Sequence, residues 1–430
     1  MGIFQTADEE LIKAGECSDI CLKRCCDMLI ADNLNPRVTV EVAASVLPHE
    51  WGVFCGLADA LKLLEGVDID VYAMPEGSMF YSGEPVMRIT GNYQDFARFE
   101  TALCGFLSQA SGVATAAAFI KLCADKVPVY SLCAGLVHPA ISAAVERSAW
   151  IGGIDGVNGS LAPSGIPHID VMPHNFVMCH SNSNDAWNAF ERLMPAEVSR
   201  VMVCGTRGDI RSDAIAAAKA GAAAVRIDVS ESTGSIRRLI EELRWELDTN
   251  GFTEVGIFVA GNLSPEDVSS LNDCADAFGI GGAIANAPSI DFSFDIVEAD
   301  GVPVSRRGNK SGAKEVYEYE DGSHILLPLS ETSILTAAAP AFAAAIASLL
   351  ISPRVPQTIT RETSAGISLS NAFHASFELE WHITKLCGIT SICGIPAGAS
   401  APLTPSIPPI HAERSTAAEI AGWTSPAQSE

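Results

Sequence analysis

Strand-like and helix-like segments alternate along residues 127–284, and this alternation constrains the fold more than any other feature of the sequence. The strand-like segments are continuous apolar runs: Val127–Cys133, Ile166–Met172, Arg200–Cys204, Ala222–Val229, Val255–Ala260 and Ala277–Ile284. Helical patterns separate them: Ala140–Trp150, Asp185–Met194, Arg211–Ala220, Ser235–Asn250 and Pro265–Asp273. Parallel strands joined by crossover helices have this order, and continuous apolar strands indicate a sheet covered on both faces. We predict a parallel α/β barrel, complete or incomplete, over an open sheet, which the pattern alone does not exclude.

The segments before this region have a different pattern. Helical patterns at Asp8–Ala31 and Glu50–Leu64 flank strand-like segments at Arg37–Ala43, Ile69–Ala73 and Pro85–Gly91. We therefore predict an N-terminal α/β domain over residues 1–112, in which the helices and strands form an α+β layer separate from the barrel. The barrel domain follows over residues 113–290. Residues 291–322 are predicted to return to the N-terminal domain, and residues 323–430 form an atypical tail of low charge.

Charge falls sharply at the start of this tail. Only 11 of the 107 residues from His324 to Glu430 are charged, and ten of the 23 prolines lie there. Its segment Ala397–Pro409 has the composition of a loop or of disorder. The uncharged stretch Ile334–Ile351 has the minimum length of a membrane span, but eight of its 18 residues are alanine. We expect a helix buried in protein there, and no membrane attachment.

The overall charge excludes several classes of partner. The chain has 27 Lys and Arg against 52 Asp and Glu, a net charge of −25. Nucleic-acid binding needs clustered cations, so we expect no nucleic-acid partner. Residues 1–10 lack the features of a secretory signal, and the 13 cysteines form no disulfide scaffold, so we expect a reducing cytoplasmic location. Without an HExxH or a paired CxxC motif, no zinc is expected.

Polar and glycine residues follow several of the predicted strands. Arg226 and Asp228 are two residues apart, so they share one face of a strand and could hold a phosphate-bearing sugar, with Asp228 on a hydroxyl or Mg²⁺. A structural ion pair is the competing interpretation. Gly261, Gly281 and Gly282 end later strands, where bare backbone N–H groups can bind an anion or simply make a tight turn.

Two histidines and one basic patch complete the candidates. His138 and His174 each follow a strand, so they could meet in one pocket as acid, base or phosphate ligand, or be hydrogen-bonded loop residues. Lys310 lies in Arg306–Lys314, the densest basic patch of this acidic chain. That patch is either an anion contact or a solvated loop.

Ten short motifs follow one another along residues 1–317: Ile3–Ala7, Leu63–Asp68, Glu100–Ala102, Ser108–Gly112, His138–Ser142, Arg147–Gly153, Met172–His174, Arg244–Leu247, Phe292–Glu298 and Arg307–Lys314. In this order they resemble the nicotinate phosphoribosyltransferase family in its short form. The resemblance implies a type II phosphoribosyltransferase fold, in which an N-terminal α/β domain packs on an irregular parallel α/β barrel. It also implies a homo-oligomer.

The same resemblance implies an activity in NAD biosynthesis. The family joins nicotinate to phosphoribosyl pyrophosphate, giving nicotinate mononucleotide and pyrophosphate, with Mg²⁺ and optional ATP hydrolysis. It implies catalytic roles for His174, Asp228 and Arg226, with Asp228 as the metal ligand. Contacts to phosphoribosyl pyrophosphate and to nicotinate or a related small acid are implied for a further set: His138, Asp19, Glu100, Thr101, Gly261, Gly281, Gly282 and Lys310.

Several strand-end positions depart from the family pattern. The family has an aromatic pair after the early aspartate, whereas Asp19 is followed by Ile20-Cys21-Leu22, so the ring that would stack on nicotinate is missing. Gly135-Leu136 stand where the family has adjacent arginines, and Cys204-Gly205 where it has Asp-Thr. Hydrophobic residues cannot replace the bidentate contact of a guanidinium with a carboxylate or phosphate.

Two hypotheses of different class remain open at this point. In the first, the chain is a working phosphoribosyltransferase that acts on nicotinate or a related acid, as the retained Arg226, Asp228 and glycine turns indicate. In the second, it is a catalytically degenerate paralogue with a structural, regulatory or ligand-binding role. The second rests on the replaced positions Cys21, Gly135-Leu136 and Cys204, because a fold outlasts the activity that it once carried.

Overall fold

A computed structural model describes residues 4–229, 235–309, 311–319, 323–329 and 350–353. Lys310, the predicted loop Ala397–Pro409 and most of Ile334–Ile351 lie outside these ranges. The last two residues of that stretch begin the strand β16 (Leu350–Pro353), where we expected a helix. Antiparallel pairing with β14 (Lys314–Tyr319) gives this backbone its partners, and β15 (His324–Pro328) pairs with the other edge of β14.

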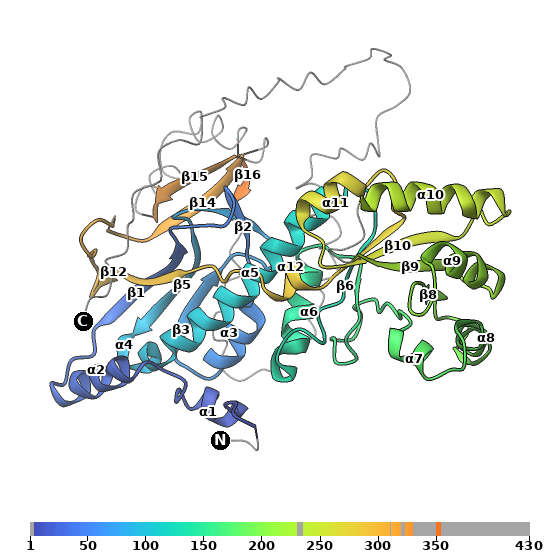
Figure 1. Cartoon of the computed structure of the whole chain (residues 1–430). Coiled ribbons are helices and arrows are strands. Elements are labelled where there is room, and N and C mark those ends of the chain that lie inside the picture. The colour runs from blue at the N-terminus through green and yellow to red at the C-terminus, as the bar shows by residue number, and fades with distance from the viewer. Residues whose placement is uncertain (1–3, 230–234, 310, 320–322, 330–349, 354–430) are drawn as a thin grey trace, which may run out of the picture. The chain divides into compact units, whose positions relative to one another are not determined.

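Five antiparallel strands form the sheet of the N-terminal domain, in the order β13-β12-β1-β5-β3 (Figure 1). Their bounds are β1 (Arg37–Ala44), β3 (Ile69–Ala73), β5 (Pro85–Asn92), β12 (Phe292–Ala299) and β13 (Val302–Pro303). The strands β12 and β13 follow the barrel in sequence, yet β12 pairs with β1 and β13 pairs with β12. The chain therefore returns to its first sheet after the barrel.

Glycines divide the two helices that the sequence predicted in this domain. Asp8–Ala31 is broken into α1 (Glu9–Lys13) and α2 (Ile20–Ala31), because Gly15 takes a left-handed φ of 73°. Glu50–Leu64 is likewise split by Gly56, whose φ is 94°. The first part is strand β2 (Trp51–Val53), paired with β4 (Met79–Tyr81), and only the second is a helix, α3 (Leu57–Leu64). After β5, the short helix α4 (Tyr93–Phe96) and a 3₁₀ turn (Ala97–Phe99) lead into the next helix.

The 25-residue helix α5 (Glu100–Ala124) was not predicted from the sequence. It buries ten residues and serves two cores: Leu103 and Leu107 pack in the N-terminal core, whereas Val113 and Ala117 pack in the barrel core. Burial on many faces removes the one-sided apolar stripe by which an amphipathic helix is recognised. Length and composition alone would let Tyr93–Ala124 cross a membrane, but half of its most apolar window is buried in the protein, as in a core helix.

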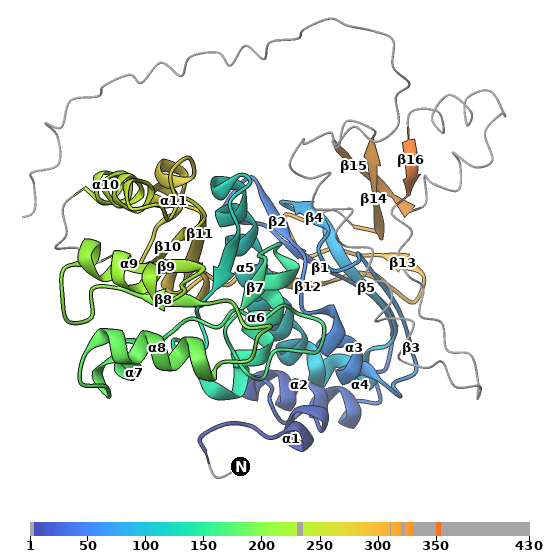
Figure 2. The same cartoon turned by 90° about the vertical axis from the view of Figure 1, so that its right-hand side faces the viewer.

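Six parallel strands form the second sheet, in the order β7-β6-β11-β10-β9-β8, and Figures 1 and 2 show it curled into a half-barrel. Their bounds are β6 (Val129–Ser131), β7 (Gly156–Val157), β8 (Val201–Val203), β9 (Ala224–Val229), β10 (Gly256–Gly261) and β11 (Ala277–Ile280). The predicted parallel α/β fold with an incomplete barrel is thus confirmed.

One predicted barrel strand, Ile166–Met172, does not form. This segment makes only two isolated bridges, His168 to Val157 of β7 and Val171 to Val201 of β8. Pro167 and Pro173 have no N–H to donate to a ladder, so pairing is interrupted on both sides. The segment therefore spans the gap between the two edge strands without becoming one.

Five helices follow the strands within two residues of their predicted bounds, namely α6 (Ser142–Ile151), α8 (Ser183–Leu193), α9 (Ile210–Lys219), α10 (Ile236–Thr249) and α11 (Pro265–Leu271). The short turn η2 (Pro139–Ile141) precedes α6. The helix α7 (His174–Met178) was not predicted, and neither was α12 (Gly282–Ala285), which begins inside the predicted strand Ala277–Ile284. The buried faces of these helices join the strands in one apolar core that includes Trp187, Leu243 and Phe278. This core fixes the positions of the strand ends.

A partly buried ion pair joins the two domains, with the Arg147 side chain 28% exposed and the Glu76 side chain 12% exposed. Arg147 of α6 donates to both carboxylate oxygens of Glu76, at 3.1 and 2.5 Å, and the Gly56 N–H donates to the same carboxylate at 2.8 Å. Burial acts to raise the pKa of Glu76, but the hydrogen bonds and charge of Arg147 outweigh it and hold that pKa below its usual value. Breaking such a pair costs more than forming it contributes, since one charge is then left buried.

Two glycines of α5 provide a matched test of the helix packing. A methyl group at Gly112 would collide with the carbonyl oxygen of Pro288, whereas one at Gly105 would meet nothing within 4 Å. Alanine is favoured over glycine inside a helix by about 1 kcal/mol. In urea unfolding, Gly105→Ala should raise the free energy of unfolding by about that amount, and Gly112→Ala should lower it by about 1–3 kcal/mol. Equal effects of the two changes would show that α5 is not packed as described.

Candidate active site at the carboxyl ends of the parallel strands

An ion pair within β9 is the centre of the candidate site. Arg226 and Asp228 are separated by one residue, so their side chains leave the same face of the strand. The Arg226 guanidinium donates from Nε to Oδ1 at 2.7 Å and from Nη2 to Oδ2 at 2.6 Å. The arginine side chain is only 14% exposed and the aspartate 31%, so the pair is largely shielded but still reachable.

His174 joins this pair from a different loop. It is the first residue of α7, which Pro173 introduces with an extended backbone. One ring nitrogen, Nε2, lies 3.0 Å from Oδ2 of Asp228, and the other, Nδ1, lies 2.9 Å from the hydroxyl of Thr206 in the loop after β8. The structure thus brings together the three residues that the sequence nominated as catalytic.

The electrostatics of Asp228 follow from these contacts. Burial acts to raise its pKa, but the hydrogen bonds and charge of Arg226, and then those of His174, outweigh burial and hold the pKa below its ordinary value. The carboxylate therefore stays ionised over the physiological pH range. An ionised carboxylate held in place suits a reaction in which positive charge develops nearby.

Bare backbone surrounds this group at the neighbouring strand ends. Gly261 ends β10 with a φ of 127°, and a Cβ there would lie 2.9 Å from the carbonyl oxygen of Val229. After β11, a Cβ on Gly282 would lie 2.9 Å from Oδ1 of Asn262. Only glycine fits such positions without displacing a neighbour, and close approach of an anion to backbone N–H groups is a function that such turns allow.

The remaining predicted residues do not join this cluster. His138 is exposed and caps η2, accepting from the Ala140 N–H at 3.1 Å. Asp19 caps α2 in the N-terminal domain, and its backbone N–H donates to the Thr101 hydroxyl at 3.1 Å. Burial, and then the charge of Asp295, raise the pKa of Glu100 beside them. Among the described residues, no hydrogen bond links this N-terminal group to His174, Arg226 or Asp228.

The positions that depart from the family pattern are poor in polar side chains. Gly135 is exposed, with open space where a side chain would begin. Leu136 is 54% exposed and close to Gly281, since a Cβ on that glycine would lie 2.9 Å from its Cδ1. Cys204 is buried, and burial raises the pKa of its thiol, so it offers no charge.

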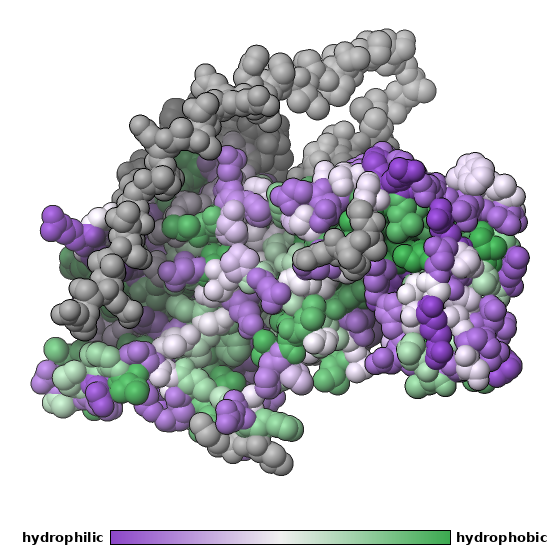
Figure 3. Space-filling model, viewed as in Figure 1, coloured by the Kyte–Doolittle hydropathy of each residue, from purple (hydrophilic) through white to green (hydrophobic). Residues whose placement is uncertain are grey.

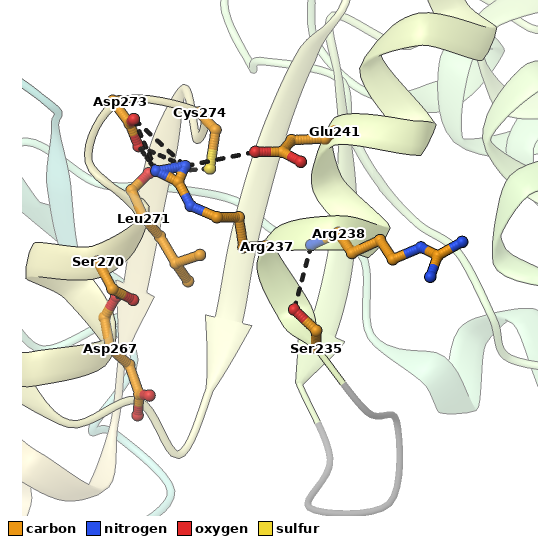
Figure 4. Close-up of polar contacts among 9 residues, drawn as sticks. All are labelled: Ser235, Arg237, Arg238, Glu241, Asp267, Ser270, Leu271, Asp273 and Cys274. Carbon is orange, nitrogen blue, oxygen red and sulfur yellow. Dashed lines mark hydrogen bonds and ion pairs between the residues drawn. The ribbon is translucent and has the colours of Figure 1, made fainter.

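Other guanidinium groups on the helices after the strands are already engaged. Figure 4 shows Arg237 at the start of α10, bound by the carboxylate of Asp273 at 2.6 Å and by Glu241 at 3.4 Å. Its neighbour Arg238 points away from this cluster and pairs with Glu242 at 2.8 Å. Neither therefore replaces the arginine pair that Gly135-Leu136 lacks.

Two further polar residues of the barrel domain were not predicted, namely Thr206, which contacts His174, and Glu146. Thr206 directly follows Cys204-Gly205. A search for polar residues after each predicted strand would have found it if it had been extended by one residue. Glu146 of α6 is fully buried; one carboxylate oxygen accepts from the Gly159 N–H at 2.7 Å, and the other has no partner among the described residues. Burial raises the pKa of this carboxyl group. No motif marks a buried glutamate inside an amphipathic helix.

Within the described ranges, no group of three or more His, Cys, Asp or Glu side chains forms a metal cage. Of the residues that the structure brings together at the site, Asp228 has the chemistry of a Mg²⁺ ligand. Two bonds from Arg226 and one from His174 occupy its oxygens. A carboxylate offers about four acceptor positions, so roughly one stays free. One carboxylate fits a Mg²⁺ ion whose other ligands are waters and substrate phosphates, which is how this ion is usually bound.

Comparison with known protein families identifies both domains. A model described as quinolinate phosphoribosyl transferase, N-terminal domain, matches residues 24–111, and one for the C-terminal domain of the same family matches residues 113–295. Together they cover more than half of the chain, and they meet between β5 and the barrel, inside α5.

Individual relatives extend this result. The chain is 28% identical over 256 residues to the nicotinate phosphoribosyltransferase pncB1 of Mycobacterium tuberculosis, a match that spans 56% of each protein. It spans 58% of the nicotinate phosphoribosyltransferase of Bacillus subtilis, at 25% identity. The solved nicotinate-nucleotide pyrophosphorylase from Pyrococcus furiosus aligns with a TM-score of 0.82 and 37% identity, covering 91% of this chain and 100% of that one.

The depressed pKa of Asp228 gives a testable effect on stability. Because its folded-state pKa lies below the unfolded value of about 3.9, the ionised carboxylate stabilises the fold above that pH. The stabilisation is lost as pH falls through the folded-state value. Urea unfolding between about pH 6 and pH 3 should therefore show a smaller acid-induced loss for Asp228→Asn than for the unmodified protein. The exposed Asp170→Asn should behave like the unmodified protein, and identical pH profiles for all three would contradict the assignment.

Proposed function

Because this chain belongs to the quinolinate phosphoribosyltransferase family of type II phosphoribosyltransferases, we propose that it is a phosphoribosyltransferase of NAD biosynthesis. It transfers the phosphoribosyl group of phosphoribosyl pyrophosphate to the ring nitrogen of a pyridine carboxylate, and the acceptor is nicotinate. The chain aligns with about half the length of curated relatives that are named nicotinate phosphoribosyltransferases. Their name supports nicotinate over quinolinate as the acceptor.

The cluster of Arg226, Asp228 and His174 at the end of β9 is the observation that carries this proposal. A structural ion pair would need only the first two residues. The third arrives from a separate loop, and the three side chains remain 14–39% exposed beside glycine turns. Charged groups that are fixed by hydrogen bonds but still open to solvent are typical of substrate sites.

In the proposed reaction, the pyridine nitrogen of nicotinate attacks C1 of the ribose, and the C1–O bond to pyrophosphate breaks. The products are nicotinate mononucleotide and pyrophosphate, so no further reactant is needed. Positive charge develops on the ribose ring as pyrophosphate leaves, and the ionised Asp228 stabilises it. Arg226 holds that carboxylate in place, while the turns at Gly261 and Gly281-Gly282 bind phosphate oxygens through backbone N–H groups.

Mg²⁺ belongs to the same proposal. Asp228 would supply its one protein carboxylate, and the ion would neutralise charge on the leaving pyrophosphate. Optional ATP hydrolysis stays a proposal by resemblance alone.

A homo-oligomer is also proposed, on the evidence of α2. This helix has no buried residue, and four of the apolar side chains on it or just after it are 53–67% exposed, namely Ile20, Met28, Ile30 and Leu34. Figure 3 shows hydrophobic residues gathered over α2. A neighbouring copy that covered this helix would also bring Asp19 and Thr101 close to a second surface.

A degenerate paralogue is the alternative function, and a specific observation favours it. The positions that would hold an acidic acceptor are Gly135, which is open, and Leu136, which is apolar and exposed. In that case the chain would bind phosphoribosyl pyrophosphate without transferring its sugar, or would bind neither substrate.

Pyrophosphate release tests the proposal directly. Purified protein with phosphoribosyl pyrophosphate and Mg²⁺ should release pyrophosphate when nicotinate is added, and form nicotinate mononucleotide by mass spectrometry. Asp228→Asn should lower kcat by at least about 10²-fold, because a fixed charge near the reacting centre is lost. Asp170→Asn should leave kcat within about twofold, since surface changes have small effects. Absence of product with nicotinate and with quinolinate would reject the proposed activity.

The open space at Gly135 allows a gain-of-function test of the acceptor side. A hydrogen bond to a charged group contributes about 1.5–3 kcal/mol, and tenfold in affinity is 1.4 kcal/mol. Gly135→Arg should therefore lower KM for nicotinate about tenfold while leaving KM for phosphoribosyl pyrophosphate nearly unchanged. Gly105→Arg adds the same charge at an exposed position of α5 that has open space and should change neither constant. A rise in nicotinate KM for Gly135→Arg would show that the acceptor does not bind there.

A further inference from the structure

The two nitrogens of His174 are both hydrogen-bonded, to groups of different chemistry. Nε2 lies 3.0 Å from Oδ2 of Asp228, and Nδ1 lies 2.9 Å from Oγ1 of Thr206. The proposed transfer reaction assigns roles to Arg226 and Asp228 but none to Thr206. A role for Thr206 in the same site rests on that proposed function.

The chemistry of the partners fixes where the proton of the imidazole lies. Both oxygens of the Asp228 carboxylate receive bonds from Arg226, so this group is an acceptor, and the contact with His174 places hydrogen on Nε2. In a neutral ring Nδ1 is then a lone pair. The Thr206 hydroxyl can donate as well as accept, so it donates to Nδ1 and completes the network.

The loop that carries Thr206 is itself held on both sides. The Gly205 N–H donates to Oδ2 of Asp213 in α9 at 2.9 Å, and Gly205 takes a left-handed φ of 79°. On the other side, Nη2 of Arg207 donates to the carbonyl oxygens of Met178 and His180, at 2.8 Å each. These carbonyls lie at and just beyond the C-terminal end of α7, the helix that begins with His174. The loop therefore contacts α7 near both of its ends.

We propose that Thr206 is a positioning residue that holds His174 in the Nε2–H tautomer. In that form His174 and Arg226 together occupy three of the roughly four acceptor positions of the Asp228 carboxylate, and one is left for the Mg²⁺ ion of the proposed reaction. Without the Thr206 hydroxyl the ring can adopt the other tautomer or rotate. Asp228 then loses one of its three bonds and its fixed orientation.

The tautomer can be observed without any turnover. In ¹⁵N-histidine-labelled protein, at a pH where the ¹⁵N shifts show a neutral ring, the spectrum of His174 should show hydrogen on Nε2 alone. His174→Gln identifies the signal. Thr206→Val, which keeps the shape but removes the hydroxyl, should show a mixture of the two tautomers, and Thr206→Ser should resemble the unmodified protein. Hydrogen on Nδ1 of the unmodified protein, or an unchanged spectrum in Thr206→Val, would overturn the proposal.

Kinetics separate positioning from substrate binding. Thr206→Val should lower kcat about 10- to 100-fold, the range seen when a metal-binding histidine loses the group that orients it, with KM for phosphoribosyl pyrophosphate changed less than about threefold. Thr206→Ser should restore kcat to within about threefold. A general loss of folding would instead lower the active fraction of both variants and the unfolding midpoint. If the unmodified protein makes no product, the proposed function fails, while the tautomer spectrum still decides the role of Thr206.

Discussion

Parallel pairing of the barrel strands is the constraint on which the site depends. Strands that run in one direction end at one edge, so loops far apart in sequence become neighbours there. The register between β9 and β10 sets Asp228 beside Ala260 and Val229 beside Gly261. A slip of one residue would turn Arg226 and Asp228 to the other face of the sheet. The apolar core beneath, with Ile227 and Val259 both buried, makes that slip costly.

The two domains are connected by side chains that serve both of them. Helix α5 contributes residues to both apolar cores, so neither core is complete without it. The Arg147–Glu76 pair adds a directional contact at the same junction. Ion pairs that are largely shielded from water contribute little net stability once desolvation is counted, but a mismatched arrangement would leave a partly buried charge without a partner. The main effect of this pair is therefore to favour one arrangement of the two domains, and its net contribution to the stability of that arrangement is small.

The sequence predicted the parallel α/β fold and the pair of Arg226 and Asp228, because strand ends can be located from apolar runs and following polar residues. The catalytic role that joined His174 to this pair was implied by the family resemblance. The sequence predicted neither α5, whose apolar residues lie on several faces, nor the interruption of Ile166–Met172 by prolines. The role of Thr206 could not be predicted from the sequence, since its hydrogen-bond partner His174 is 32 residues away along the chain. The separation of Asp19 and Thr101 from the barrel cluster could not be predicted either, because the order of motifs along a chain does not say how far apart they lie in space.

The proposed donor and acceptor sides of the site differ in how tightly the fold constrains them. On the donor side, Gly261 approaches the backbone of Val229, and Asp228 is tied to two other residues, so substitutions there disturb packing or an ionised network. On the acceptor side, Gly135 is open and Leu136 exposed, so their side chains can change without cost to the core. The loss of the family's arginines at these two positions is therefore weak evidence that the proposed donor side has lost its function. Recognition of the acceptor is the part of this site that sequence divergence can alter while the architecture stays the same.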